Sequence, residues 1–306
     1  MRVALITNPA ASSVSSRSRV MIQKAISNEH DLVVHETSRQ GHATRLAHRS
    51  MRDGCDVVVT LGGDGTVNEA VNGLLGSDCA LMPLPGGSTN VFARAVGFPN
   101  DAVEATRVLL SALKLRSFRR ASVGMANERA FVFHVGIGFD AAVVTRVEER
   151  SPLKRYAGHP WFIASAIRTW VSPERRSLSF DITTDDQRTI RGAQMAVAMN
   201  VNPYTFLGNR PIDLAPEVSL DTPLSVVATT SLAITKLLPI ASAAFGRTEG
   251  GLPNKGTATH WTDVEALTIT SERGVPYQLD GEPQAPVNEL RLFHRPNAVT
   301  IVVPPV

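Results

Sequence analysis

Short apolar runs alternate with amphipathic stretches over roughly the first third of the chain. Runs rich in valine, isoleucine and leucine predict strands at Arg2–Thr7, Asp31–Glu36, Cys55–Leu61 and Ala80–Leu84. The other stretches have apolar residues at helical spacing and predict helices at Ser18–Ser27, His42–Met51, Val67–Leu75 and Ala102–Leu113. This strand-then-helix order predicts a doubly wound parallel sheet, and such sheets bind ligands beyond the carboxyl ends of their strands.

The pattern changes after about Arg120. The segments that follow are rich in β-forming residues and are separated by Gly, Asn, Asp and Pro turns, which predicts an antiparallel, all-β sandwich-like domain. Two apolar stretches, HPWFIASAIRTWV at 159–171 and ITKLLPIASAAF at 234–245, have helical spacing instead. We therefore expect two domains with a boundary near Phe118–Ser122.

Composition narrows the class of protein. The chain has 306 residues, 43% of them hydrophobic, a net charge of +3 and a pI near 9.1, as expected for a globular protein with a mild preference for anionic partners. Its two cysteines, Cys55 and Cys79, lie in apolar runs, so disulfides and metal–thiolate sites are not expected. With neither a signal-peptide pattern nor an apolar run long enough to span a bilayer, the chain is expected to be cytoplasmic.

Three loops should meet at the carboxyl edge of the predicted sheet: TNPAASS after the first strand, LGGDGT after the third and LPGGSTN after the fourth. Glycine allows a ligand to approach the backbone, and the start of the next helix offers free N–H groups, so such turns suit a phosphate. Asp64 would repel a bare phosphate but fits one bridged by Mg²⁺, as in nucleotide-dependent phosphoryl transfer. The alternative is a plain strand-to-helix turn capped by Asp64 or Thr66, and by Ser88 or Asn90 in the later loop.

The motifs occur together, and in this order, in one family. NP at 8–9, TSRQGHA at 37–43, GGDGTVNEAVNGL at 62–74, PGGSTNVFARAVGFP at 85–99, HVGIGFDA at 134–141 and LDGEP at 279–283 resemble the diacylglycerol kinase catalytic family, specifically its bacterial soluble lipid kinases. Sphingosine and ceramide kinases are similar. The resemblance implies a nucleotide-binding α/β domain like that of NAD kinase and phosphofructokinase at 1–120, to which 288–306 return, and a β-rich lipid-substrate domain at 121–287.

The resemblance also implies a site. ATP would contact Asn8, Thr37, Gly62, Gly63, Asp64, Gly65, Thr66, Val67, Asn68, Glu69, Gly87, Ser88, Thr89 and Asn90. Asp64 would hold the Mg²⁺ of the nucleotide, Glu282 would be the general base for the lipid hydroxyl, and Asp280 would orient that base or join the metal network. Without the family, Asp280–Gly281 is simply a tight hairpin turn.

Three positions depart from the family pattern. Val91 and Ser122 stand where many members have acids, and Thr222 replaces the carboxylate ligand of a structural Mg²⁺ site, of which Asp221 remains. Because a hard divalent ion prefers carboxylate oxygens, this structural site is in doubt.

We therefore expect an ATP- and Mg²⁺-dependent lipid kinase that phosphorylates a primary hydroxyl, of diacylglycerol or a related lipid, in contact with an anionic membrane surface. The apolar stretches at 159–171 and 234–245 or the basic run KLRSFRR at 114–120 could meet that surface, although core helices and a solvated turn fit the same patterns. A sphingoid or other lipid kinase, an NAD kinase with Asp64 as base, and a catalytically silent nucleotide- or lipid-binding regulator are the alternatives. No pattern suggests a nucleic-acid partner, and a homodimer is left open.

Overall fold

The computed structural model describes residues 1–9, 11, 13–148, 168–170, 172, 178–246 and 258–305. It divides into unit 1, Met1–Val123 with Pro296–Val306, and unit 2, Gly124–Arg295. The boundaries predicted from the sequence, at 120/121 and 287/288, lie three and eight residues earlier. Strands β5 (Phe118–Ala126) and β16 (Glu282–Val302) carry the chain from one unit into the other.

Unit 1 is built on a parallel sheet with strand order β4-β3-β1-β2. The bounds are β1 Arg2–Thr7, β2 Asp31–Glu36, β3 Val57–Gly62 and β4 Ala80–Pro85. The end of β16 adds a further parallel strand, where Ile301 pairs with Leu81 of β4. Every residue of β3 and β4 is buried, as expected for strands covered on both faces.

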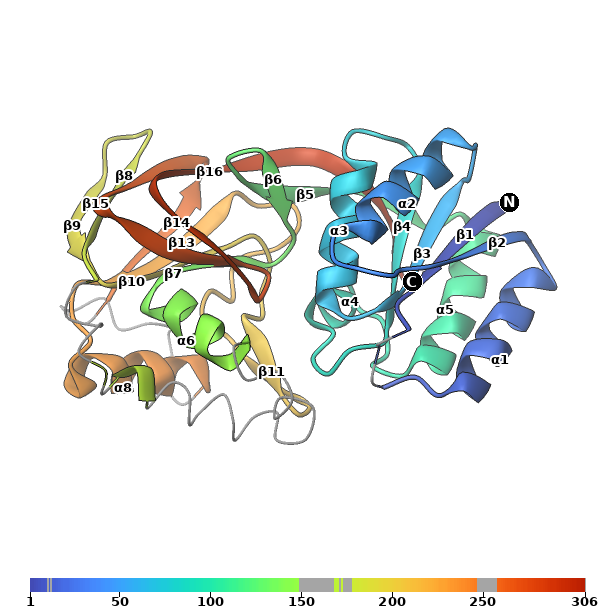
Figure 1. Ribbon diagram of the computed structural model, residues 1–306, viewed down its shortest axis with the longest axis horizontal. Helices are drawn as coiled ribbons and strands as arrows, with labels where there is room; N and C mark the ends of the chain where they lie inside the picture. The colour runs from blue at the N-terminus through green and yellow to red at the C-terminus, as the bar shows by residue number, and fades with distance from the viewer. Residues whose placement is uncertain are drawn as a thin grey trace. The chain divides into compact units, whose positions relative to one another are not determined.

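Helices cover both faces of this sheet (Figure 1). Helices α1 and α5 lie on one face, α2 and α3 on the other, and short α4 follows β4; their bounds are Ser16–Ser27, Ala102–Leu115, His42–Arg52, Asp64–Leu74 and Val91–Ala95. The helices α2 and α3 pack closely because Gly73 has no side chain: a Cβ there would lie 2.3 Å from the Thr44 carbonyl oxygen. The predicted doubly wound parallel fold is confirmed.

Unit 2 is a β-rich structure with strand order β14-β13-β10-β7-β15-β16, antiparallel throughout. The bounds are β6 Arg129–Phe131, β7 His134–Gly138, β8 Phe180–Thr184, β9 Thr189–Ala193, β10 Met195–Met199, β11 Thr205–Leu207, β12 Arg210–Ile212, β13 Leu224–Thr229, β14 Thr259–Val264 and β15 Ala266–Leu279. Phe131, Phe180, Leu267 and Leu290 are in its core. Helices α6 (Phe139–Glu148) and α8 (Ile234–Ala244) belong to this unit, and the predicted β-rich class is confirmed.

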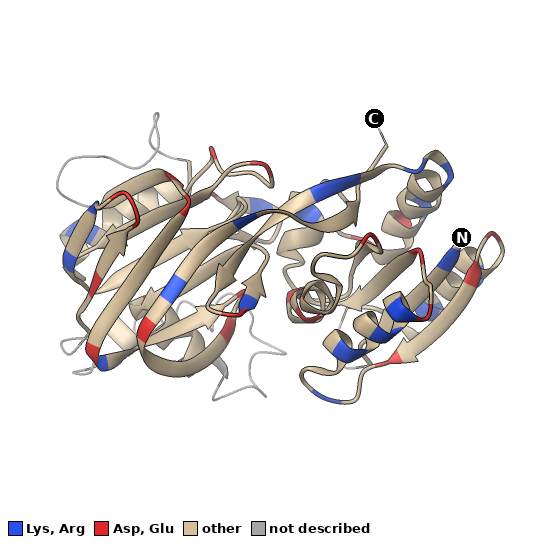
Figure 2. Cartoon of the chain, turned by 90° about the horizontal axis from the view of Figure 1, so that it is seen from above, with Lys and Arg blue, Asp and Glu red and all other residues tan. Residues whose placement is uncertain are grey.

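The helix predicted at 234–245 is observed as α8. The stretch at 159–171 lies outside the described residues except for 168–170. Both cysteines are free and buried, and burial raises the pKa of Cys79 to about 12. Within the described ranges, no helix combines the length and apolar character that crossing a membrane requires. Basic and acidic positions are interspersed along both units (Figure 2), in keeping with the small net charge.

Candidate active site

Three loops of unit 1 are joined by backbone hydrogen bonds at the carboxyl ends of β1, β3 and β4. The Asn8 N–H donates to the Leu61 carbonyl at 3.0 Å and the Gly86 N–H to the Gly62 carbonyl at 2.9 Å. The Ser13 N–H donates to the Gly86 carbonyl at 3.4 Å. The loops therefore meet where the parallel strand order predicts a ligand site.

Two glycine pairs allow the second and third of these loops to touch backbone to backbone. A Cβ on Gly86 would lie 2.8 Å from the Gly62 nitrogen, and one on Gly87 would lie 2.7 Å from the Gly63 Cα. No side chain fits at either distance, because the obstructing atoms are backbone that cannot move aside. These glycines therefore have a packing role that is independent of any bound phosphate.

Asp64 links the same two loops through its side chain. It is the first residue of α3, so the helix starts three residues before the predicted Val67, and Gly63 is the N-cap. Its carboxylate accepts hydrogen bonds from the Phe92 N–H at 3.1 Å and the Thr89 hydroxyl at 3.2 Å. Asp64 thus caps α4 of the neighbouring loop, rather than its own helix as the simple turn interpretation supposed.

Opposing effects act on this carboxylate. Burial raises the pKa of Asp64, while the hydrogen bonds from Phe92, Val91 and Thr89 lower it. A cation bound beside the group would offset the cost of burying its charge. The described residues hold no group of three His, Cys, Asp or Glu side chains suited to a metal, but nucleotide-borne Mg²⁺ needs only one or two carboxylates plus phosphate oxygens. Asp64 fits that requirement.

Asn90 closes the third loop. It has a left-handed conformation with φ of 49°, its Oδ1 accepts from the Gly87 N–H at 2.8 Å, and its Nδ2 donates to the Gly87 carbonyl at 3.0 Å. A second bond from Nδ2 reaches Asn100 Oδ1 at 2.8 Å. Ser88 is exposed at the tip of this loop. Asn90 therefore shapes the loop, and Ser88 is the residue presented to solvent.

The remaining nucleotide-site predictions fall into two groups. Asn8, Thr37, Gly63 and Gly65 are partly exposed along the loop edge, and the Asn8 amide lies 3.5 Å from the Thr66 hydroxyl. Thr66, Val67 and Asn68 are buried in α3.

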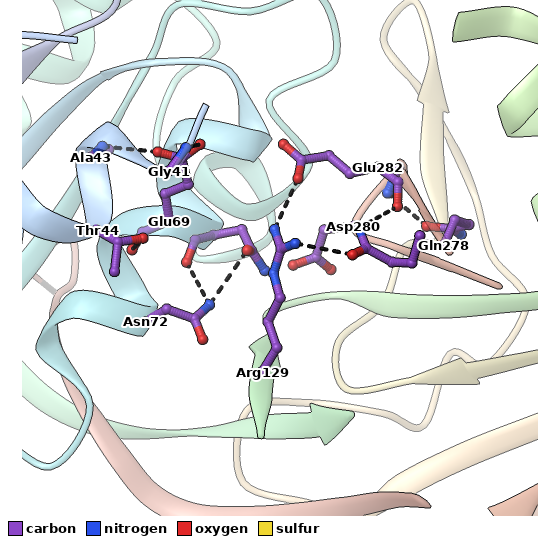
Figure 3. A network of polar contacts seen from close by, with 12 residues as sticks. Gly41, Ala43, Thr44, Glu69, Asn72, Arg129, Gln278, Asp280 and Glu282 are labelled. Atoms are coloured by element: carbon purple, nitrogen blue, oxygen red, sulfur yellow. Dashed lines mark hydrogen bonds and ion pairs between the residues drawn. The ribbon is translucent and has the colours of Figure 1, made fainter. Parts of the chain in front are cut away.

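Glu69 has a different environment from the other predicted nucleotide ligands. Its two carboxylate oxygens accept hydrogen bonds from the Gly41 N–H at 2.7 Å and the Ala43 N–H at 2.8 Å (Figure 3). Its own carbonyl accepts from the Thr44 hydroxyl at 2.9 Å. An acid at this place satisfies the free amides and the positive dipole end of α2. Glu69 is thus a helix cap supplied by the adjacent helix.

Asp280 of unit 2 forms a backbone anchor. Its carboxylate accepts from the N–H groups of Val132 at 2.7 Å, Phe133 at 2.9 Å and His134 at 3.1 Å. The residue is 4% exposed and has a φ of 49°, and with Gly281 it makes the turn between β15 and β16. The hairpin interpretation of Asp280–Gly281 therefore describes the backbone, while the carboxylate attaches that turn to the connection between β6 and β7.

Glu282, two residues later, is held by an arginine. Arg129 Nη2 lies 2.9 Å from Glu282 Oε2 (Figure 3). Nη1 of the same guanidinium donates to Gln284 Oε1 at 3.3 Å. The side chains of Arg129 and Glu282 are 34% and 23% exposed. Sequence analysis missed Arg129, because 153 residues separate the two partners and no local pattern connects them.

A buried polar network supports the same turn. Gln278 Oε1 accepts from the Gly281 N–H at 2.7 Å, and its Nε2 donates to Asp140 Oδ2 at 2.9 Å. The Tyr204 hydroxyl donates to the other oxygen of Asp140 at 2.6 Å, and its ring lies 4.4 Å from that of His134. Burial raises the pKa of Asp140 and of Tyr204 and lowers that of His134 to about 3. His134 therefore packs against this network as a neutral imidazole.

The positions that depart from the family pattern have local structural partners. The Thr222 hydroxyl donates to the Ser219 carbonyl at 3.1 Å and accepts from the Ser219 N–H at 3.0 Å, which closes the turn before β13. Asp221 is exposed in the same turn. Val91 and Ser122 are buried, and the Val91 N–H faces Asp64.

Comparison with known proteins identifies relatives for this arrangement. The family sequence model described as "Diacylglycerol kinase catalytic domain" matches residues 2–126. The chain is 30% identical over 289 residues to the Chromohalobacter salexigens protein named "Probable lipid kinase YegS-like", with 90% of this chain and 85% of that protein covered. It is 25% identical over 252 residues to a diacylglycerol kinase of Staphylococcus saprophyticus, with 80% and 76% covered.

Solved structures share the fold. A diacylglycerol kinase structure from Bacillus anthracis str. Sterne superposes with a TM-score of 0.71 at 21% identity, covering 99% of this chain and 97% of that one. An NAD kinase from Archaeoglobus fulgidus, solved in complex with ATP, superposes with a TM-score of 0.50 at 11% identity, covering 99% and 94%.

Proposed function

Because this chain belongs to the diacylglycerol kinase catalytic family, we propose that it transfers the γ-phosphate of ATP, with Mg²⁺, to the hydroxyl of diacylglycerol. Family membership makes it a lipid kinase, a phosphotransferase with an alcohol acceptor. The donor, the metal and the acceptor lipid are our proposal. The relative with the widest coverage reported above is named for lipid kinase activity without a named lipid, so the acceptor needs a direct test.

The observation that supports the proposed chemistry best is that the carboxylates of Asp280 and Glu282 have different environments. The carboxylate of Asp280 is buried and occupied by three backbone N–H groups. Glu282 is partly exposed, and one of its carboxylate oxygens is held by Arg129. A general base must reach the hydroxyl of its substrate, so Glu282 suits that role and Asp280 suits the role of fixing the turn that carries it.

In the proposed reaction, Glu282 accepts the proton of the lipid hydroxyl, and the oxygen of that hydroxyl forms a bond to the γ-phosphorus. The bond from that phosphorus to the bridging oxygen of the β-phosphate breaks, and ADP leaves. Arg129 keeps the Glu282 side chain in one orientation, and positioning of this kind is the main contribution of proteins to phosphoryl transfer.

The loops of unit 1 suit the nucleotide side of the reaction. The N–H groups at the start of α3 and the exposed Ser88 are the donors available to phosphate oxygens. Asp64 would hold Mg²⁺, which when bound neutralises the negative charge of the phosphates. Asp64 also caps α4, so the same side chain would couple the shape of both glycine loops to the bound cation.

The test is transfer of labelled γ-phosphate from ATP, with and without Mg²⁺, to mixed micelles that each contain one lipid. The panel is diacylglycerol, a sphingoid base, ceramide and a polyprenol, with soluble NAD in a parallel tube. We expect label on diacylglycerol only when Mg²⁺ is present. Label on another lipid alone would replace the acceptor, and label on NAD alone would refute the lipid assignment and make Asp64 the candidate base.

Glu282→Gln tests the base within the same assay. It should lower kcat by about 10²- to 10⁴-fold, the usual contribution of a general base, and leave ATP affinity within about twofold. Glu289→Gln is the matched control, because it makes the same change at an exposed position of the same strand. Undiminished turnover by the Glu282 variant would remove this residue from the chemistry.

A further inference from the structure

The turn before β13 contains the position where the family pattern has the carboxylate ligand of a structural Mg²⁺, and here that position is Thr222. The Ser219 carbonyl accepts hydrogen bonds from the Thr222 N–H at 3.2 Å and from the Thr222 hydroxyl at 3.1 Å. Mg²⁺ and Ca²⁺ prefer oxygen ligands that include carboxylates. The turn offers one exposed carboxylate, Asp221, a neutral hydroxyl and a carbonyl that already accepts two hydrogen bonds, so its residues do not fit such an ion.

A cluster of three side chains joins the two ends of this turn to β14. Ser225, the second residue of β13, is fully buried, and its hydroxyl lies 2.8 Å from Glu217 Oε1 and 2.8 Å from His260 Nε2. The same Glu217 oxygen lies 2.9 Å from His260 Nε2. These three atoms form a closed triangle, here named the Ser225 cluster, whose corners come from the segment before the turn, from β13 and from β14.

The hydrogens that are available fix the direction of these contacts. A serine hydroxyl has one hydrogen, which Ser225 donates to the Glu217 carboxylate, and the Trp261 carbonyl lies 3.2 Å from the same hydroxyl. The contact between Ser225 and His260 therefore needs a hydrogen on His260 Nε2. A ring nitrogen that carries a hydrogen cannot ligate a metal. The Ser225 cluster is thus held together by hydrogen bonds to a carboxylate, which are stronger than those between neutral groups.

The cluster lies at an irregularity of the sheet. Strands β13 and β14 pair Leu224 with Val264 and Val226 with Trp261, so residues 262 and 263 together stand opposite Ser225. Such a bulge interrupts the ladder of backbone hydrogen bonds between two strands. The Ser225 hydroxyl supplies contacts to β14 and to Glu217 at this interruption.

We propose that the Ser225 cluster performs in this chain the structural role that the family pattern assigns to a cation, so that unit 2 keeps its fold at the turn before β13 without a divalent ion. The proposal goes beyond the lipid kinase reaction and does not depend on it. It separates two needs for Mg²⁺: turnover requires the ion proposed for the nucleotide at Asp64, whereas the fold of unit 2 requires none.

The test is hydrogen exchange of the full chain, without nucleotide or lipid, in EDTA and in about 5 mM Mg²⁺ or Ca²⁺. The amides at 217–227 should exchange at the same rate, within about twofold, in all three solutions. A cation bound in the turn with a Kd one-hundredth of its concentration would slow their exchange about a hundredfold, because opening would require its release. Such slowing, or a divalent metal that elemental analysis finds in the EDTA-treated protein, would overturn the proposal.

Ser225→Ala removes the centre of the cluster. It should accelerate exchange at 217–227 about ten- to hundredfold, the effect of losing a hydrogen bond to a charged group, and added Mg²⁺ should not reverse this change. Ser271→Ala is the matched control, because the Ser271 hydroxyl also donates to a residue distant in sequence, the Ser179 carbonyl at 3.1 Å, within the same unit. The control should leave exchange at 217–227 unchanged.

Glu217→Gln provides a second variant in case Ser225→Ala does not fold. The Glu217 side chain is 39% exposed, so a change of its charge leaves the core intact. Because a neutral amide accepts more weakly than a carboxylate, exchange at 217–227 should accelerate about three- to tenfold. Glu265→Gln is its control, since Glu265 Oε2 also lies near a histidine, 3.4 Å from His294 Nδ1, and this change should have no effect at 217–227.

Unchanged exchange at 217–227 in Glu217→Gln and in a folded Ser225→Ala protein would refute the role of the cluster. None of these measurements requires turnover. A failure of the kinase assay would therefore leave this proposal standing, and a cation found in unit 2 would leave the proposed function standing.

Discussion

Replacing Asp280 by asparagine should open the turn that carries Glu282. Asparagine tolerates the left-handed conformation at this position, so the change tests the carboxylate and leaves the backbone preference almost unchanged. The amide oxygen of asparagine can still accept from Phe133 and His134, but its NH₂ group would face the Val132 N–H, which now lies 2.7 Å from a carboxylate oxygen. Two donors would then oppose each other in a buried site.

The size of the effect follows from these contacts. A hydrogen bond to a charged group contributes about 1.5 to 3 kcal/mol, and an unsatisfied buried N–H costs about 1 to 3 kcal/mol. Because the two terms overlap for Val132, we expect a loss of about 2 to 4 kcal/mol in the free energy that keeps this segment closed. At about 1.4 kcal/mol per factor of ten, hydrogen exchange of the amides at 132–134 should accelerate by roughly 30-fold or more.

The assay is hydrogen exchange followed by mass spectrometry, together with kinase turnover. Asp263→Asn is the control, because Asp263 also has a positive φ, of 53°, but is exposed. It should leave exchange at 132–134 unchanged. If Asp280→Asn leaves exchange unchanged and abolishes turnover as fully as Glu282→Gln, then Asp280 acts in the chemistry and the anchoring argument fails.

Three other predictions test the neighbouring contacts. Arg129→Met should lower kcat about tenfold at unchanged ATP affinity because Glu282 loses its orienting ion pair, with partial rescue by Arg129→Lys; equal kcat in all three proteins would contradict this. Glu69→Gln should lower the free energy of unfolding by about 1 kcal/mol at unchanged ATP affinity, measured by urea titration and calorimetry, whereas weaker ATP binding at full stability would restore its predicted nucleotide role. His134 has a folded-state pKa of about 3 against 6.5 when unfolded, so the unfolded chain binds the extra proton and stability falls as pH drops from 6.5 towards 3, by up to about 1.4 kcal/mol per pH unit. The His134→Phe protein should lack this contribution, so the difference between the two free energies of unfolding should change with pH below 6.5 by up to this slope, and parallel pH profiles would refute the neutral-histidine assignment.

Local patterns predicted the framework of unit 1 well. The apolar runs at 2–7 and 31–36 are strands with those bounds, and the carboxyl ends of three strands bring the glycine loops together as their order requires. These features depend on the spacing of apolar residues within short segments, and that spacing is visible in a single sequence. The β-rich class of unit 2 was predicted for the same reason.

Contacts between distant residues could not be predicted in this way. Glu69 reads as part of a nucleotide motif, and nothing in its neighbourhood shows that Gly41 and Ala43, 28 and 26 residues earlier, take both of its oxygens. The start of α3 at Asp64 was missed because glycines on either side suggest a loop, whereas the cap that Asp64 provides is for α4. Arg129 was missed for the same reason as the cap that Asp64 provides for α4: its partner, Glu282, is close to it only in the folded chain.

The interruption of unit 1 by unit 2 has a consequence for the order in which the protein can be made. Strand β4 ends at Pro85, but the strand beside it contains Ile301, so a growing chain must be extended by a further 216 residues before that edge is covered. At ribosomal speeds of about 5 to 20 residues per second, β4 waits on the order of 10 to 40 seconds with an open edge. Unit 2, which is continuous, can complete its own sheet within that interval. Unit 1 is begun first and finished last.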